Sequence, residues 1–458
     1  MKKKILIVCI LTSVLLMNAC SNPIESTSIE EKAAELLPQY VPDHSGLYAA
    51  VEEILEHTGA DFIGHYPVTE DFFYWVAKHY GRKCLMDIAK GGDYSDPNLW
   101  FLKTGDSIHV LWVKYCKSTG LDAYDYSHIH EIRTKESDQI SIDFSGDVNL
   151  AENMATTIYM DSRPNGITDC FSEDLLQEMT SCDLFVVNNE FGYTERGEAL
   201  SGKPYTFRAS PKRVSDMEAI GTDLVTLANN HVWDFGEIGM LDTLDTLEKA
   251  NMPYVGAGRD LKEAMRPQYY IFGGRKIAIV NATQIERSLD YTKEATATMA
   301  GVLKTLHSDK FCNVIRNAKK HSDLVIVCVH WGTEGNNYYG ADQVKLAEDF
   351  VNAGADAIIG GHTHCLQGIE YIGDVPVYYS LGNYWFASTT NMPASYDTGL
   401  ARLEIDNDLT ITARFIPARF SEGVTSKLVD EQNQSVYSLL ETYAKSTTID
   451  KNGVIHKR

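Results

Sequence analysis

A short buried strand that ends directly in two histidines most constrains the fold of this chain. The apolar stretch 357–359 is followed by two glycines and then by His362 and His364, which stand one residue apart. Small and branched apolar residues bounded by glycine are typical of a strand covered on both faces. In open α/β sheets, ligands bind just beyond the carboxyl ends of such strands. Taken alone, the stretch predicts either a metal site or a turn with two solvated histidines.

Other predicted strands end in the same way. They are 140–145 before Asp147 and Asn149, 184–187 before Asn188 and Glu190, 224–227 before Asn230 and His231, 324–329 before His330, and 375–379 before Asn383. Amphipathic helical stretches over 239–250, 311–320 and 341–352 lie between them, and this alternation predicts a largely parallel sheet. A closing hairpin over 399–405 and 409–416 favours a four-layer α/β/β/α sandwich over a simple doubly wound sheet.

The carboxyl ends of parallel strands meet at one edge of a sheet, so we expect the polar side chains after these strands to lie together. Aspartate and asparagine are also common turn formers, which is the alternative for each residue taken singly. Five such strand ends on one edge favour a metal site. Oxygen and imidazole ligands without thiolate suit zinc, manganese, iron or magnesium better than copper.

The N-terminus has the pattern of a bacterial export signal. Three lysines at positions 2–4 precede the apolar stretch 5–17, which is too short to span a bilayer comfortably. Ala19 before Cys20 resembles a lipobox, in which the cysteine becomes lipidated. We expect a signal peptide over 1–19, lipidation of Cys20 and a tether over 20–45. An ordinary signal peptide and an uncleaved anchor are the alternatives. A lipid anchor predicts a protein on the bacterial cell membrane that faces the periplasm or the exterior.

Composition and periodicity divide the rest of the chain. The formal net charge is −22, which argues against binding of nucleic acid through the body of the protein. Residues 46–136 are rich in aromatics and show helical periodicity, so we expect a small, mostly helical N-terminal module of unknown role. The α/β domain is expected over 137–420, and a C-terminal helix with a frayed tail over 421–458.

The strand ends together resemble the bacterial capsule-synthesis proteins of the CapA type. These proteins are associated with poly-γ-glutamate synthesis and belong with the calcineurin-like metallophosphatases. The motifs that carry the resemblance are Gly146-Asp147, Asn188-Asn189-Glu190, Ala228-Asn229-Asn230-His231 with Asp234-Phe235-Gly236, His330-Trp331-Gly332, Gly361-His362-Thr363-His364 and the stretch from Ser380 to Phe386. The resemblance covers about residues 140–417, does not include the N-terminal module, and implies a sandwich of the metallophosphoesterase type.

The resemblance also implies a role for each site residue. Asp147 and His364 would hold one divalent metal ion, Asn230, His330 and His362 would hold a second, and Glu190 would bridge the two. His231 would be the general acid, with a structural histidine that caps the turn to Asp234 as the alternative. Asn149, Asn188 and Asn383 are further candidate site residues. Trp331, Tyr384 and Trp385 either wall the pocket or pack in the core.

Two functions remain open on this evidence. The first is a lipid-anchored, metal-dependent hydrolase of the phosphoesterase type, involved in capsule or poly-γ-glutamate type polymer synthesis. The second is a non-catalytic accessory protein that binds an anionic polymer during capsule assembly or export. Dinuclear phosphoesterases usually have histidine where Asn149 stands and aspartate where Glu190 stands, which favours the second function, while the histidines favour the first. The expected partners are the polymer or phosphoester, the membrane and capsule-synthesis proteins.

Overall fold

The computed structural model describes residues 50–51, 54, 70–90, 97–106, 108–119, 129–132, 139–285 and 291–458. The predicted signal peptide over 1–19, the lipidation site Cys20, the tether over 20–45 and part of the N-terminal module lie outside the described residues. Within these described ranges, no helix is both long enough and apolar enough to serve as a membrane span.

Two large sheets form the centre of the molecule. The seven-stranded sheet has the order β1 (Ile129–Ile132), β9 (Gln268–Phe272), β10 (Arg275–Thr283), β12 (Leu324–His330), β13 (Ala357–Gly361), β15 (Val375–Tyr378) and β14 (Ile369–Ile372). The eight-stranded sheet has the order β19 (Val424–Lys427), β18 (Ile411–Ser421), β17 (Tyr396–Ile405), β2 (Ile140–Val148), β3 (Leu184–Asn189), β6 (Leu224–Thr226) and β7 (Tyr254–Val255), with β16 (Asn383–Trp385) paired to β2.

Each sheet combines a run of parallel strands with antiparallel pairing toward the β14 edge and between β9 and β10 in the first sheet, and toward the β19 edge in the second. Strands β10, β12, β13 and β15 run parallel in the first sheet, and β2, β3, β6 and β7 run parallel in the second. The hairpin of β17 and β18 joins β2 in antiparallel pairing, as the sequence predicts for that end of the domain.

The period-two alternation of strand side chains separates two faces of each sheet. Ile326 and Cys328 of β12 pack in the core between the sheets with Ile142 and Phe144 of β2. Val327 of β12 points to the opposite face, into a core shared with the covering helices. Both faces are apolar, and this explains why the predicted strands read as continuous hydrophobic runs.

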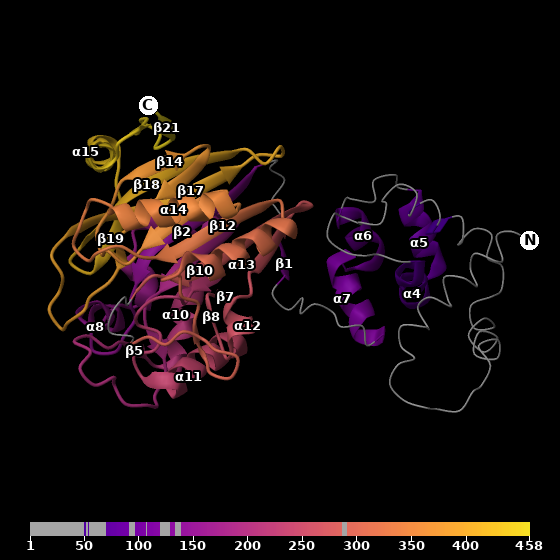
Figure 1. The fold of residues 1–458 in the computed structure, drawn as a ribbon, viewed down its shortest axis with the longest axis horizontal. Coiled ribbons are helices and arrows are strands. Elements are labelled where there is room, and N and C mark those ends of the chain that lie inside the picture. The colour runs from indigo at the N-terminus through magenta and orange to yellow at the C-terminus, as the bar shows by residue number, and fades with distance from the viewer. Residues whose placement is uncertain are drawn as a thin grey trace, which may run out of the picture.

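Helices cover both outer faces and complete four layers. The first sheet is covered by α13 (Ser308–Lys320) and α14 (Ala341–Ala353), which lie across β10 and β12 in Figure 1 and share a core with them. The second sheet is covered by α9 (Glu173–Ser181), α10 (Val214–Ala219) and α11 (Gly236–Lys249), with α8 (Ala155–Asp161) and the 3₁₀ turns η3 (Gly166–Cys170) and η4 (Pro211–Arg213) nearby in the chain. The predicted α/β/β/α sandwich is confirmed.

Small elements decorate the sandwich. They are the two-stranded sheets β4 (Gly192–Tyr193) with β5 (Arg208–Ala209) and β8 (Ala257–Gly258) with β11 (Gly301–Val302), and the short helix α12 (Leu261–Ala264). The C-terminal segment differs from the predicted frayed tail, because α15 (Asp430–Tyr443) is followed by a hairpin of β20 (Thr447–Ile449) and β21 (Ile455–Lys457). Glu370 of β14 holds the turn between α15 and β20, because it accepts hydrogen bonds from the backbone amides of Lys445 and Ser446.

The described N-terminal residues form a helical group with its own core (Figure 1). Its helices are α4 (Glu70–Tyr80), α5 (Arg82–Ala89), α6 (Pro97–Thr104) and α7 (Ile108–Thr119). Phe72, Trp100 and Trp112 are buried in that core. Strand β1, which falls inside the range 46–136, pairs with β9 of the seven-stranded sheet. The domain boundaries themselves remain a prediction.

Candidate metal centre

Metal-ligand side chains from both sheets meet at one edge of the sandwich. They are Asp147 near the end of β2, Glu190 directly after β3, Asn230 in the loop after β6, His330 as the last residue of β12, and His362 and His364 after β13. The strand register places these residues at the same height along neighbouring strands, because Asp147 is opposite Asn188 of β3 and His330 is opposite Gly361 of β13. The convergence expected from the sequence is present.

One group of ligand atoms surrounds the imidazole of His330. The ligand atoms of Glu190, His330 and His362 all lie within 4.8 Å of one another. His330 Nε2 is 3.4 Å from Glu190 Oε1, 3.2 Å from His362 Nδ1 and 2.8 Å from Asn230 Oδ1. These four residues therefore present nitrogen and oxygen lone pairs to one small volume, which is the donor set that zinc, manganese and iron prefer.

A second group lies beside the first and shares one member with it. The ligand atoms of Asp147, Glu190 and His364 also lie within 4.8 Å of one another. His364 Nδ1 is 3.4 Å from Asp147 Oδ2. Glu190 is common to both groups, which is the position that the resemblance assigns to a bridging ligand. The roles of these residues as ligands remain a prediction that the geometry supports.

The surroundings of Glu190 test whether the site fits a cation. This side chain is fully buried, and within the described residues neither carboxylate oxygen has a hydrogen-bond partner. A buried carboxylate without hydrogen bonds or a counter-charge is costly. The imidazole of His330 lies 3.4 Å from Glu190 Oε1, and ligand atoms of His362 and His364 lie within 4.8 Å of the same carboxylate. A divalent cation would take the place of the hydrogen bonds that this carboxylate lacks, so the residues fit the metal that the resemblance implies.

The charges of the second group act strongly on His364. Burial lowers the pKa of a histidine, but the negative charges of Glu190 and Asp147 outweigh it and raise the pKa of His364 to about 10. Burial raises the pKa of Asp147, but the hydrogen bond with His364 and the charge of His330 outweigh it and lower the pKa of that carboxyl. The site is an electronegative pocket that attracts positive charge.

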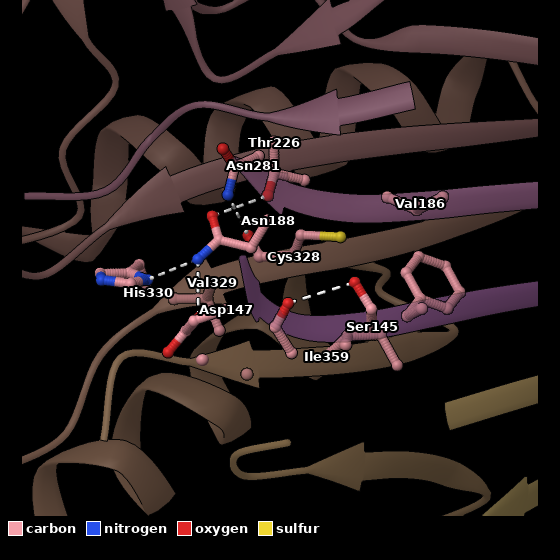
Figure 2. A pocket seen from close by; sticks show the side chains of 14 residues that line it. Ser145, Asp147, Val186, Asn188, Thr226, Asn281, Cys328, Val329, His330 and Ile359 are labelled. Carbon is pink, nitrogen blue, oxygen red and sulfur yellow. Dashed lines mark hydrogen bonds between the residues drawn. The ribbon is translucent and has the colours of Figure 1, made fainter. Parts of the chain in front are cut away.

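Asn188 holds two of the ligands in place (Figure 2). Its amide nitrogen donates to Asp147 Oδ1 at 2.7 Å and lies 3.5 Å from His330 Nδ1. Its amide oxygen accepts from Thr226 and Asn229. Asn188 is not a member of either ligand group, but its side chain contacts two of the members, Asp147 and His330. Hydrogen bonds from such neighbouring residues orient metal ligands.

The backbone around His362 is shaped for close approach. A Cβ added at Gly361 would come within 2.9 Å of Asp147 Oδ1, so a side chain here would displace the Asp147 carboxylate. His362 and His364 have φ angles of 93° and 57°. Such left-handed conformations cost about 1 to 3 kcal/mol each in residues other than glycine and cluster at functional sites. The backbone of the His362-Thr363-His364 motif is therefore strained in the conformation that brings both imidazoles to the site.

His231 faces a cavity next to the second group. The cavity has a volume of about 320 Å³, and His231, His364 and Asn383 line it. His231 Nδ1 is bonded to Asp234 Oδ2 at 2.7 Å. Because Nδ1 is engaged by a carboxylate, Nε2 is the nitrogen that can exchange a proton with a ligand in the cavity. The sequence predicts His231 as the acid but does not assign Asp234 as its partner.

The other candidate asparagines have different places. Asn383 accepts a hydrogen bond at 2.7 Å from His364 Nδ1 and so orients that imidazole. Asn149 lies outside both ligand groups, because its amide nitrogen donates to Ala387 O and its amide oxygen accepts from Ala151 N. The residue two positions after Asp147 therefore contributes a local turn.

Two features of the site escape the sequence analysis. Lys203 donates to Asp234 Oδ1 at 2.6 Å and also to the backbone carbonyl of Asn230, and its loop carries no periodic pattern that would have singled it out. The aromatic side chains at the cavity are Tyr205, Phe207 and Phe386. By contrast, Trp331, Tyr384 and Trp385 are fully buried and pack in the cores, which was the alternative for them.

Comparisons with known proteins show which family the chain resembles. The family described as bacterial capsule synthesis protein PGA_cap matches residues 141–388, more than half of the chain. The PGA biosynthesis protein CapA of Bacillus subtilis (strain 168) is 30% identical over 260 residues, 56% of this chain and 66% of that protein. The capsule biosynthesis protein CapA of Bacillus anthracis is 31% identical over 229 residues, 48% of this chain and 54% of that protein.

The match therefore spans less than two thirds of each relative's own length. A solved structure of a phosphatase from Mycoplasma pneumoniae aligns with 15% identity and a TM-score of 0.39, and covers 65% of this chain and 96% of that one. The family match spans the strand ends that carry Asp147, Glu190, Asn230, His330, His362 and His364. The chain belongs to the bacterial capsule synthesis protein family PGA_cap.

Proposed function

We propose that this chain is a lipid-anchored, metal-dependent phosphoester hydrolase that acts in the synthesis of a capsule polymer of the poly-γ-glutamate type. The observation that carries the proposal is the sharing of buried Glu190 between two ligand groups, with His231 lining the cavity beside them. Family membership supports the link to a capsule polymer. The names of the relatives from the two Bacillus species support the same link.

In this proposal, divalent cations supply part of the chemistry and side chains of this chain supply the rest. Divalent cations at the two groups would neutralise a phosphate and activate a water molecule as nucleophile. Asp147, Glu190 and the three histidines would hold them, and Asn188 would keep Asp147 and His330 in register. The cavity would hold the part of the substrate that leaves.

His231 would complete the reaction as general acid. The bond from phosphorus to the leaving oxygen breaks while a bond from phosphorus to the water oxygen forms. His231 Nε2 gives its proton to the leaving oxygen and is reprotonated from solvent, while the attacking water releases its proton to solvent. Asp234, bonded to Nδ1 at 2.7 Å, fixes the ring and stabilises the protonated form.

The anchor is a separate part of the proposal. The basic residues at 2–4, the apolar stretch 5–17 and Ala19 before Cys20 support lipidation of Cys20 and a position on the outer side of the cell membrane. Replacement of Cys20 by Ser should move the protein from the membrane fraction to the soluble fraction. Membrane retention of that variant, together with absence of a lipid label on the wild type, would contradict the anchor.

A non-catalytic accessory protein is the second candidate. Asn149 favours it, because the position at which related phosphoesterases usually carry histidine is occupied here by a side chain bonded to Ala151 and Ala387. In this reading, the same electronegative pocket binds cations that in turn hold an anionic polymer without cleaving it.

A comparison of two esters separates the two functions. His231→Ala should slow hydrolysis of an alkyl phosphodiester about a hundredfold, the range for loss of a general acid, and should affect an activated aryl ester much less. His307→Ala replaces an exposed histidine outside the cavity and is the matched control. Bound metal should be unchanged in both variants. Equal losses on both esters, or no hydrolysis by the metal-loaded wild type, would contradict catalysis by His231.

A further inference from the structure

The cavity beside His231 has walls whose chemistry indicates what it binds. It lies on the side of the site where the proposed leaving group would depart, because His231 and His364 both line it. Its volume of about 320 Å³ is enough for a single small ring rather than for a folded polymer. The residues around it therefore report on the group that is attached to the phosphate.

Aromatic rings form a continuous wall from one histidine to the other. The ring of Phe207 is 4.3 Å from that of His231 and 5.6 Å from that of Phe386, which in turn is 4.8 Å from the ring of His364. Tyr205 adds a further ring to the lining and is 53% exposed. Aromatic faces carry partial negative charge and attract polarised C–H groups and apolar ring faces.

Apart from His231 and His364, the polar side chains of the lining are uncharged or acidic. Ser388, Thr389 and Asn391 are exposed residues that line the cavity with hydroxyl and amide groups. The exposed carboxylate of Glu334 also lines it. Among the described lining residues there is no lysine and no arginine. The basic side chains of the lining are His231 and His364, which belong to the reaction site, so a carboxylate-bearing group elsewhere in the cavity would meet Glu334 and no lysine or arginine. Like charges at such a site disfavour binding.

We infer that the cavity binds an uncharged, hydroxyl-rich sugar unit as the leaving group of the phosphoester, rather than a glutamate unit or another carboxylate-bearing group. The role of the sugar as a leaving group rests on the proposed hydrolase function, whereas its binding in the cavity does not. Aromatic faces for the C–H groups of a sugar ring, hydroxyl and amide groups for its hydroxyls, and Glu334 as a hydrogen-bond acceptor together match such a unit. The phosphoester that this chain cleaves would then join a phosphate to a sugar unit.

Two esters that differ in one group test the charge preference. Sorbitol 6-phosphate and 6-phosphogluconate have the same carbon chain and phosphate, and differ only by a hydroxymethyl group against a carboxylate at C1. With the full chain in a detergent that has no sugar headgroup, kcat/KM for sorbitol 6-phosphate should exceed that for 6-phosphogluconate by about tenfold or more. Glu334→Gln should narrow this ratio. A ratio of one, or a preference for the carboxylate, would overturn the inference.

The aromatic contact has its own test with a ring substrate. Tyr205→Ala should raise KM for glucose 6-phosphate about tenfold, since a stacking surface is lost at the cavity. Tyr338→Ala is the matched control, because Tyr338 is 58% exposed but is not among the residues that line the cavity. Equal KM values for the wild type and both variants would overturn the assignment of the aromatic wall to a sugar ring.

A binding measurement distinguishes failure of this inference from failure of the proposed hydrolase. If no ester is cleaved, the hydrolase proposal fails, and saturation-transfer NMR with maltotriose and with tri-γ-glutamate on the same protein still tests the cavity. Transfer to maltotriose that weakens in Tyr205→Ala supports the sugar site. Transfer only to the glutamate peptide, or to neither compound, contradicts it.

Discussion

Lys203 and Asp234 form an ion pair inside the site, with 2.6 Å between Nζ and Oδ1 and side chains that are only 4% and 0% exposed. The same Lys203 ammonium donates to the backbone carbonyl of Asn230, and the same Asp234 carboxylate is bonded to His231. One buried cation thus connects the loop that carries a metal-ligand candidate with the partner of the proposed general acid.

Loss of Lys203 should therefore destabilise the protein. Lys203→Met removes the lysine charge from the buried Asp234 carboxylate and leaves it only the bonds to His231 and to the Phe207 amide, which should lower the free energy of unfolding by about 3 kcal/mol. Urea denaturation of the wild type and the variant measures this loss. The double variant with Asp234→Asn should recover part of the stability, because the buried carboxylate charge that lost its lysine partner is gone.

A surface pair provides the control for this prediction. Lys345 and Asp349 are 2.9 Å apart, but the Lys345 side chain is 72% exposed. Lys345→Met should change the free energy of unfolding far less, since exposed ion pairs contribute little. Similar losses in Lys203→Met and Lys345→Met would mean that burial of the first pair has no energetic consequence.

The contribution of Glu190 to stability should depend on a bound metal. Its carboxylate oxygens have no hydrogen-bond partner within the described residues, so Glu190→Gln in chelator should lose no hydrogen bond, only the attraction to His364, and should lower the free energy of unfolding little. The same variant should lose the stabilisation that a divalent cation gives to the wild type. Denaturation curves with chelator and with manganese measure both effects.

Glu370 is the matched control for Glu190. Its carboxylate is also buried, but it accepts hydrogen bonds from Tyr339 and from the amides of Lys445 and Ser446. Glu370→Gln should lower the free energy of unfolding in chelator by about 2 kcal/mol or more, because bonds to the charged group are lost. A larger loss in Glu190→Gln than in Glu370→Gln would contradict the view that Glu190 is kept for a cation.

Metal binding should strengthen as pH rises. The pKa of His364 is raised to about 10 by the charges of Glu190 and Asp147 against the opposing effect of burial, so the imidazole is protonated at neutral pH when no cation is bound. A cation requires the neutral ring and must displace that proton. Affinity should therefore increase about tenfold per pH unit up to the pKa of His364.

Calorimetry measures the same displacement directly. Titration with manganese at pH 7, in buffers of different ionisation enthalpy, should show release of about one proton from His364. In His364→Ala this release should disappear. Binding without proton release in the wild type would mean that His364 is not displaced and does not take part.

The strand ends could be predicted from the sequence because each is a local signal. An apolar run followed by a turn with a polar residue identifies Asp147, Glu190 and His330 without knowledge of the pairing, and parallel topology then places them on one edge. Strands β9 and β10 were not predicted, although Gly273-Gly274 between two apolar runs is a recognised hairpin signal. That omission left the first strands of the seven-stranded sheet undescribed.

The contacts between distant segments could not be predicted in the same way. Lys203 lies 31 positions before Asp234, in a loop without periodicity, and its burial depends on how that loop folds over the site. Phe207 and Phe386 meet from different parts of the chain to line the cavity. Asn149 stands two residues after Asp147, and this spacing suggests a metal ligand. The structure shows instead that its side-chain amide is bonded to the backbone, because its nitrogen donates to Ala387 O and its oxygen accepts from Ala151 N.

The most direct measurement of the central claim is anomalous diffraction from crystals of the protein grown with manganese. Two anomalous peaks are predicted, one between His330, His362 and Glu190 and one between Asp147, His364 and Glu190, with Glu190 in contact with both. Absence of a peak at Glu190, or manganese bound only at residues away from these two groups, would contradict the claim that this carboxylate links a pair of metal positions.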